Sequence, residues 1–190
     1  MKVVALNGSP RSAGNTSVAV NVIFDELEKM GIMTEQIQMY GSVLTPCNDC
    51  GSCIIRGDGR CINEDDDMNS YLDELAVSDG IIFASPSYHG GIPGQMKILL
   101  ERISIASPPL NRLKGKIGCA VSVQGHHGGL GTYSEMIGHM LLNGMIVIGS
   151  DPLPILTGAK PGDVMNDKAG ISALKRMGKE MGELIIKLKV

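Results

Sequence analysis

The sequence lacks both a long hydrophobic segment and a large excess of charge. No apolar run reaches the roughly 20 residues that a membrane helix needs, and the opening "MKVVALNGS" is too short for the core of a secretory signal. The net charge of −3 provides no basic surface for covering phosphates, which argues against a nucleic-acid partner. We therefore expect a cytoplasmic protein with no nucleic-acid and no membrane partner.

The sequence also lacks an internal repeat and a low-complexity linker. Its 190 residues, 43% of them hydrophobic, are enough to bury one full core, so we expect a single domain over residues 1–190. Apolar runs bounded by Gly, Ser, Pro or charged residues predict strands at 2–8, 34–41, 80–86, 116–123 and 145–150. Helical patterns lie between and after them, at 16–30, 65–76, 93–103, 132–144 and 170–188.

Strands that alternate with helices predict an α/β fold with a parallel sheet covered on both faces. The right-handed crossover rule leaves few topologies, and we favour a flavodoxin-like three-layer sandwich with five strands in the order 2-1-3-4-5. Residues 34–41 alternate more than the other runs, which is typical of an edge strand. Residues 151–169 fit neither pattern, and a loop that long is usually a lid, a binding loop or a subunit contact.

Two familiar phosphate-binding motifs, GxxxxGK[ST] and GxGxxG, are absent. The stretch "NGSPRSAGNTS", residues 7–17, nevertheless opens the first helix, whose unpaired N–H groups and partial positive charge favour an anion. Hydroxyl, amide and guanidinium donors come from Ser9, Arg11, Asn15, Thr16 and Ser17. The alternative is a Gly- and Ser-rich turn capped by Asn15 or Thr16.

Two further Gly-rich loops, residues 85–95 and 122–134, follow the third and fourth predicted strands. In the order 2-1-3-4-5 the chain reverses between strands 1 and 3, and ligands bind there outside the carboxyl ends of the strands. Tyr88 is placed to lie along a flat ring, and the glycines after it let backbone N–H groups approach the polar edge of that ring. His126 and His127 either face a substrate or are solvated loop side chains.

The motifs "GSPRSAGNT" and "SPSYHGGIPGQMKILLER", in that order, resemble the NADPH-dependent FMN reductase branch of the flavodoxin-like proteins. The resemblance spans roughly residues 1–150, and it implies that the first loop binds the FMN phosphate while the other two line the isoalloxazine. The implied phosphate ligands are Ser9, Arg11, Asn15 and Thr16, with Ser17 as a further hydroxyl donor of that loop. The implied ring-lining residues are Pro86, Ser87, Tyr88, His89 and Gly90 on one side and Ser122, Gln124, Gly125, Gly128 and Gly129 on another. No residue is assigned a catalytic role.

The stretch "PCNDCGSCIIRGDGRC", residues 46–61, holds four of the five cysteines with the spacing C-x2-C-x2-C-x7-C. In a reducing compartment such a group more often serves metal or redox chemistry than disulfides. A [4Fe–4S] cluster, free or redox-active thiols, and zinc stay open as interpretations. We favour the cluster, because structural zinc usually takes two separated knuckles whereas three cysteines here follow one another closely. The predicted ligands are Cys47, Cys50, Cys53 and Cys61.

This spacing resembles the iron–sulfur flavoproteins, which add a compact four-cysteine motif to the same fold. Similar cysteines followed by "DDM", here residues 66–68, also occur in flavin reductases of this branch without a proven cluster. The cysteine-rich loop, residues 46–62, follows the second predicted strand, so we expect the cysteines on the flavin side of the molecule. The fifth cysteine, Cys119, lies in an apolar strand pattern and is expected in the core.

These features predict a flavin-dependent oxidoreductase that binds FMN and one [4Fe–4S] cluster. We expect electrons to move between a ferredoxin-like donor or NAD(P)H and a small-molecule acceptor, since a cluster passes single electrons and a flavin accepts one or two. The resemblance implies a homo-oligomer, a dimer or tetramer, in which one subunit's cluster serves a neighbour's flavin. The alternatives are an NAD(P)H-dependent FMN or quinone reductase without a cluster and a non-enzymatic flavodoxin-like electron carrier. The sequence has no Trp and so has fewer aromatic residues to sandwich a flavin, which counts against the flavodoxin-like carrier.

Overall fold

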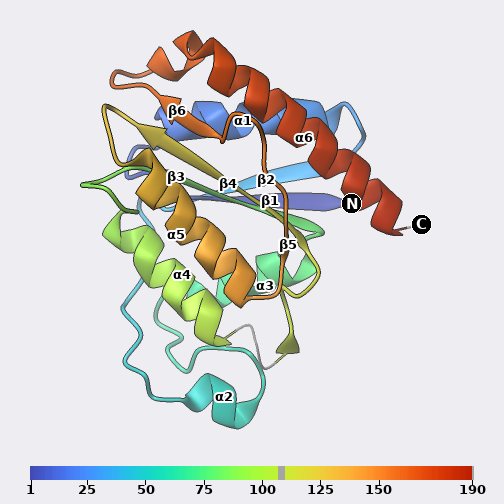
Figure 1. Cartoon of the computed structure of the whole chain (residues 1–190). Coiled ribbons are helices and arrows are strands. Elements are labelled where there is room, and N and C mark those ends of the chain that lie inside the picture. The colour runs from blue at the N-terminus through green and yellow to red at the C-terminus, as the bar shows by residue number, and fades with distance from the viewer. Residues whose placement is uncertain (107–109, 190) are drawn as a thin grey trace.

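The computed structural model describes residues 1–106 and 110–189, which form a layered α/β structure (Figure 1). The strands are β1 (Lys2–Asn7), β2 (Met33–Gln38), β3 (Gly80–Pro86), β4 (Ile117–Gln124), β5 (Ile146–Val147) and β6 (Ile155–Thr157). The helices are α1 (Asn15–Glu28), α2 (Ser52–Arg56), α3 (Met68–Val77), α4 (Gly94–Ala106), α5 (Gly129–Leu142) and α6 (Lys168–Lys189), with a 3-10 helix η2 (Asp163–Asn166). All the predicted strands and helices are present, and β5 is shorter than predicted.

The strands pair in parallel in the order β2-β1-β3-β4-β5, which confirms the flavodoxin-like topology. Beyond β4, two short strands share the next position in the sheet. β5 pairs with Ile117 and Gly118 at the start of β4, and β6 pairs with Ser122–Gln124 at its end. The sheet therefore has one strand more than predicted, because part of residues 151–169 extends it and η2 follows within the same segment.

Side chains that alternate along the central strands fill two cores, one on each face of the sheet. Val3 and Ala5 pack with α1 and α6 on one face, and Leu6 and Phe83 pack with α3, α4 and α5 on the other. Figure 1 shows the same division, with α1 and α6 above the sheet and the other three helices below it. Cys119 is fully buried in the first core, as predicted.

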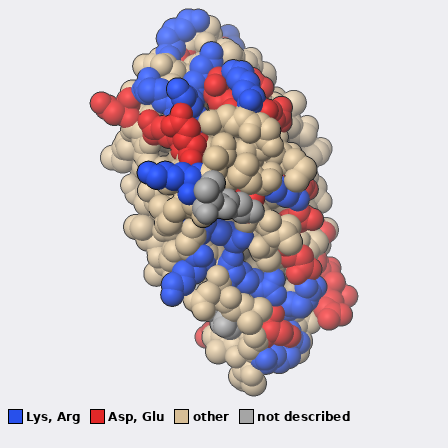
Figure 2. All heavy atoms as spheres, turned by 90° about the vertical axis from the view of Figure 1, so that its right-hand side faces the viewer, with Lys and Arg blue, Asp and Glu red and all other residues tan. Residues whose placement is uncertain are grey.

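The helices are amphipathic, as the covering layers of a sheet require. α6, the longest helix, buries Leu174, Met177 and Met181 against the sheet and exposes lysines along its other side. Among the helices of residues 1–106 and 110–189, none is long and apolar enough to cross a bilayer. On the face turned to the viewer in Figure 2, Lys and Arg lie between Asp and Glu, so neither sign of charge covers that face.

The loops that leave the carboxyl ends of β1, β3 and β4 meet at one edge of the sheet, on the left in Figure 1. The chain after β2 leaves the same edge but then runs along the layer of α3 and α4. It carries the short helix α2, which lies beneath α4 in Figure 1, far from the other three loops. The fold therefore separates the cysteine-rich loop from the Gly-rich loops.

Candidate functional site

The loop after β1 forms a fixed turn at the start of α1. A Cβ added to Gly8 would lie 2.8 Å from Met96 Cβ, so a larger residue would push the turn away from α4. The side chain of Asn7 accepts the Ser9 N–H at 2.9 Å, and Ser9 Oγ accepts the Arg11 N–H at 3.1 Å. The first N–H groups of α1 follow directly and have no partner within the helix. This turn and the helix start together present donors suited to an anion.

Two adjoining cavities open between the loops after β1, β3 and β4. The inner cavity, of about 290 Å³, is lined by Ser9, Arg11, Gly14, Asn15, Thr16, Pro86, Ser87, Tyr88, Val123, Gly125, His126, Gly158 and Ala159. The outer cavity, of about 370 Å³, is lined by Arg11, Ser87, Tyr88, His89, Gly125, His126 and His127. A helix start at one end and an aromatic ring at the other suit a molecule that joins a phosphate to a flat ring.

The loop after β3 is a tight turn beside both cavities. The Tyr88 N–H donates to Gly91 O at 2.9 Å, and the Gly91 N–H donates back to Tyr88 O at 3.1 Å. Within the turn, His89 and Gly90 adopt left-handed φ values of 51° and 93°. A Cβ added to Gly128 would lie 2.7 Å from Gly90 Cα, so glycine lets the loop after β4 touch this turn. Tyr88 stays 43% exposed and is accessible to a ligand in either cavity.

Sequence reasoning missed Gly158 and Ala159, which line the inner cavity from the segment between β6 and η2. Asn15 holds this segment in place. Its Nδ2 donates to Gly158 O at 3.0 Å and to Lys160 O at 2.8 Å, and its Oδ1 accepts the Gly162 N–H at 2.8 Å. Asn15 thus lines the cavity while its amide binds the chain itself. The one signal in the sequence was the long irregular stretch before the last helix, for which a binding loop was one interpretation.

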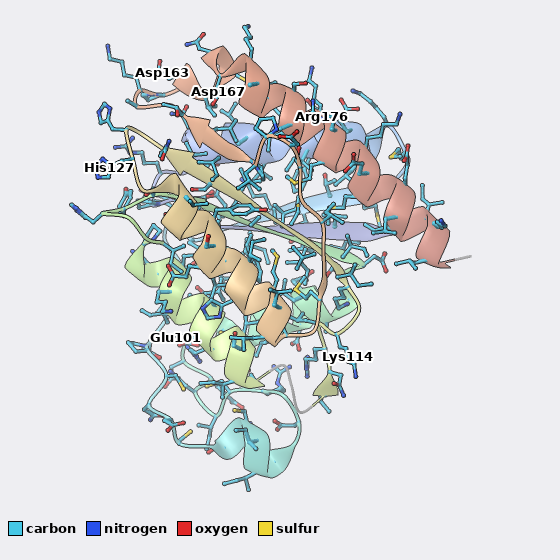
Figure 3. The ribbon with its side chains drawn as sticks, in the orientation of Figure 1. Glu101, Lys114, His127, Asp163, Asp167 and Arg176 are labelled. Carbon is cyan, nitrogen blue, oxygen red and sulfur yellow. The ribbon has the colours of Figure 1, made fainter. Side chains whose placement is uncertain are left out.

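Two acidic side chains also fix this segment. Asp163 Oδ2 accepts the Lys160 N–H at 2.8 Å, and Asp167 Oδ2 accepts the Thr157 N–H at 3.0 Å. Figure 3 shows both carboxylates above His127, near the edge where β4 ends. Hydrogen bonds between side chains and the backbone therefore fix the segment between β6 and η2 beside the inner cavity.

Nine of the predicted cofactor-binding residues line the two cavities, and six do not: Ser17, Gly90, Ser122, Gln124, Gly128 and Gly129. Strand alternation explains part of the difference. Val121 and Val123 face the core under α1 and α6, so Ser122 between them points to the opposite face of the sheet. Its Oγ is buried there without a hydrogen-bond partner in the described part of the chain. Gln124 Oε1 instead accepts the Gly129 N–H at 2.8 Å, which fixes the start of α5.

The four clustered cysteines lie away from these cavities. They line a separate cavity of about 100 Å³, together with Arg102 and Ile105 from the end of α4. The Tyr88 turn precedes the start of the same helix at Gly94, whereas Arg102 and Ile105 lie 8 and 11 residues further on, which is about 12–17 Å along the helix at 1.5 Å per residue. The prediction that the cysteines lie on the flavin side is therefore wrong. Residues 39–67 leave the expected edge, but they are long enough to run back along α3 and α4.

The cysteine-rich loop presents its thiols without closing a disulfide. All four are free; two are exposed and two are partly buried. The Asp49 N–H donates to Cys47 Sγ at 3.4 Å. Hydrogen bonds from Ser52 lower the pKa of Cys50, whereas burial raises the pKa of Cys53. Within residues 1–106 and 110–189, no group of three or more His, Cys, Asp or Glu side chains is arranged to hold a metal ion. The sulfurs share a cavity but do not have a coordination geometry.

Glycines shape this loop around α2. Gly51, Gly57 and Gly59 have φ values of 67°, 63° and 63°, which side chains with a Cβ rarely adopt. These left-handed positions reverse the chain and return Cys61 to the cavity of the other three cysteines. Four free thiols on one cavity, with a backbone N–H already bonded to sulfur, form a donor set that fits a group held by thiolates.

A buried ion pair lies against the cysteine cavity. Arg102, 3% exposed, donates through both terminal nitrogens to Asp66, and it also donates to Thr45 O at 3.0 Å. Burial raises the pKa of Asp66, but hydrogen bonds from Arg102 and Thr45 outweigh this effect and lower that pKa to about 2. Burial lowers the pKa of Arg102, and its hydrogen bonds to Asp66 and Cys61 reverse that effect. Both groups are therefore charged at neutral pH.

The fold and the cavities together define a flavodoxin-type α/β protein with two adjoining cavities at the carboxyl edge of its sheet. The family model for the NADPH-dependent FMN reductases matches residues 1–157 of the chain. The chain therefore belongs to this family and is an FMN-dependent oxidoreductase.

Individual relatives extend the comparison. The chain is 35% identical to an iron-sulfur flavoprotein of Methanocaldococcus jannaschii, and the alignment covers 100% of both chains. It is 32% identical to an iron-sulfur flavoprotein of Methanosarcina thermophila over 80% of this chain and 78% of that one. An NAD(P)H:quinone oxidoreductase from Methanothermobacter marburgensis has a similar structure, with a TM-score of 0.72 at 16% identity over 95% of this chain and 96% of that one. That structural match confirms the fold.

Proposed function

We propose that this FMN-dependent oxidoreductase also carries one [4Fe–4S] cluster and links one-electron to two-electron transfer. The observation that carries the proposal is that Cys47, Cys50, Cys53 and Cys61 line one cavity. The full-length relative from Methanocaldococcus jannaschii, named an iron-sulfur flavoprotein, supports the same conclusion. A cluster of this type takes four thiolates and passes single electrons, whereas a flavin accepts one or two.

The inner cavity is the proposed FMN site. The first N–H groups of α1, the Thr16 hydroxyl and the Arg11 guanidinium bind the phosphate, because a helix start and a forked cation both favour an anion. Ser9 Oγ stabilises the turn by accepting the Arg11 N–H. Pro86 and Tyr88 line one side of the isoalloxazine. The outer cavity, with its three histidines, leaves room for the nicotinamide or the small-molecule acceptor to approach the ring.

The position of the cysteines bears on the partners. Within one chain the cysteine cavity lies about 12–17 Å along α4 from the helix start that follows the Tyr88 turn, and electron transfer slows steeply with distance. We therefore infer a homo-oligomer in which one subunit's cluster serves a neighbour's flavin. The proposed donors are a ferredoxin-like protein or NAD(P)H. Free and exposed thiols, as at Cys47 and Cys50, persist in a reducing compartment such as the cytoplasm.

One observation favours a second candidate function. In the described residues, no three potential ligands are arranged for a metal ion, although the four sulfurs share a cavity. A chain that binds no cluster would be an NAD(P)H-dependent FMN or quinone reductase in which hydride reaches the flavin directly. The cysteines would then be free thiols on the outside of α4.

Anaerobic purification followed by iron, sulfide and flavin analysis separates the two candidates. The proposal expects about four irons and four sulfides per FMN, with absorbance beside the flavin bands that dithionite bleaches. Cys53→Ala should lose the iron and keep the FMN. Cys119→Ala removes a thiol from the core, far from the cavity, and should keep both. A wild-type protein that binds FMN but no iron or sulfide would contradict the cluster and favour the simpler reductase.

A further inference from the structure

The pair formed by Arg102 and Asp66 is more deeply buried than an ordinary surface ion pair. The side chain of Arg102 is 4% exposed and that of Asp66 is 0% exposed. Each of the other ion pairs that the described residues form contains at least one side chain that is 40% exposed or more. A charge pair taken out of water is costly, so its position points to a role beyond stability.

Hydrogen bonds fix the pair from two directions. Asp66 Oδ2 accepts the Thr45 N–H at 3.1 Å and the Thr45 hydroxyl at 2.8 Å, and Asp66 Oδ1 accepts the Met68 N–H at 3.2 Å. Arg102 donates to Thr45 O at 3.0 Å from the end of α4. The segment that leads into the cysteines is therefore joined to α3 and α4 through this pair, and the guanidinium has one position.

The guanidinium also faces the cysteines. Arg102 lines the same cavity as the four thiols, and among the described residues that line it, Arg102 is the one Lys or Arg. Asp49 is the one acidic residue in that lining, and Asp66 lies behind Arg102 rather than in the lining. A cluster with four thiolates is already negatively charged, and reduction adds one more electron. A fixed cation whose own side chain is buried beside the thiolates favours that reduced state.

We propose that Arg102 sets the reduction potential of the group bound by the cysteines, with Asp66 as the counter-charge that limits its effect. The inference rests on the proposed function, since it requires a cluster in this cavity. The electron transfer that it concerns forms and breaks no bond: the cluster gains one electron from the donor. Arg102 raises the midpoint potential of that step, and Asp66 lowers it.

The test is an anaerobic redox titration with dithionite, followed by the electron paramagnetic resonance of the reduced cluster. Arg102→Gln removes the cation and should move the midpoint potential to more negative values. Asp66→Asn leaves the cation without its partner and should move the midpoint to more positive values. Arg102→Lys keeps the charge and should stay nearer to wild type than Arg102→Gln. Lys97→Gln removes a cation that lies on the same helix outside the cavity and should leave the midpoint unchanged.

The opposite signs distinguish a charge effect from a structural one. A residue that only holds the loop would give shifts of the same sign, or the same loss of iron, in Arg102→Gln and Asp66→Asn. The double variant Arg102→Gln with Asp66→Asn buries no unpaired charge, so it controls for misfolding of the single variants. Its midpoint potential should lie between those of the two single variants. A cluster-loaded wild type with midpoints unchanged in all these variants would overturn this inference alone. A wild type without iron and sulfide would overturn the proposed function together with it.

Discussion

Gly131 offers a sharp test of how the loops at the carboxyl edge of the sheet are packed. It lies in the first turn of α5, where an added Cβ would stand 2.5 Å from the carbonyl oxygen of Gly90, a backbone atom of the turn beside both cavities. Gly138 lies in the same helix, and a Cβ there would meet no atom within 4 Å. The same substitution, Gly→Ala, therefore probes a crowded and an open position of one helix.

The two substitutions should differ in their effect on stability. Alanine is favoured over glycine in a helix by about 1 kcal/mol, and this gain is available at both positions. Overpacking typically costs about 1–3 kcal/mol, and it applies only at Gly131 because a backbone oxygen cannot rotate away as a side chain can. Gly138→Ala should therefore stabilise the protein by about 1 kcal/mol, whereas Gly131→Ala should be less stable than Gly138→Ala by about 1–3 kcal/mol.

Urea unfolding of the FMN-free protein and titration with FMN measure the two ways in which the clash can be relieved. If the turn stays in place, the cost lowers the free energy of unfolding. If the Gly90 carbonyl shifts instead, the cost falls on FMN binding, where about 1–3 kcal/mol corresponds to about 5- to 150-fold weaker affinity. Equal unfolding midpoints and equal FMN affinities for Gly131→Ala and Gly138→Ala would refute the reasoning.

Three further predictions use other parts of the structure. The pKa of Asp66 is lowered from 3.8 to about 2, so Asp66 should contribute about 2 kcal/mol of stability above pH 4 that is lost as the pH falls towards 2. In urea unfolding across this range, the free energy of unfolding should depend less on pH in Asp66→Asn than in wild type. The same pH dependence in both proteins would contradict the prediction. Burial raises the pKa of Cys119 to about 12, so a thiol reagent should label four cysteines in the native, cluster-free protein and the fifth only in urea; fast native labelling of Cys119 would show an open core. Asn15→Ala removes three hydrogen bonds to the segment that lines the inner cavity. At about 0.5–1.5 kcal/mol each, their loss should weaken FMN binding about tenfold or more. Asn21 is exposed on the same helix, so Asn21→Ala should leave FMN binding unchanged.

The sheet and its Gly-rich edge were predictable because their signals are local. Apolar runs such as 80–86 and 116–123 mark buried strands, and the crossover rule leaves few possible orders for them, among which the observed order was favoured. The first loop needed only the rule that a helix start after a strand presents unpaired N–H groups. Ser122 was predicted in the site because it opens the stretch 122–134, but it lies within β4, and its position between Val121 and Val123 turns it to the other side of the sheet.

The features that sequence reasoning missed depend on contacts between distant residues. Gly158 becomes part of the inner cavity because Asn15, 143 residues earlier, bonds to its carbonyl oxygen. The cysteine-rich loop lies at the far end of α4 because Asp66 pairs with Arg102 across 36 residues. Neither partner carries a pattern of its own, since a single Asn at a helix start and a single Arg in an amphipathic helix each have many ordinary roles.

The cavities at the sheet edge and the cysteine cavity depend on different parts of the fold, and α4 connects these parts. The inner and outer cavities are lined by the loops after β1, β3, β4 and β6, so their shape follows from the sheet. The cysteine cavity is lined by the long loop after β2 and the end of α4, so its shape depends on a buried ion pair. The two sets of lining residues share no member. Energetic effects of substitutions in the two sets should therefore add within one chain, and any departure from additivity within the chain would have to pass through α4.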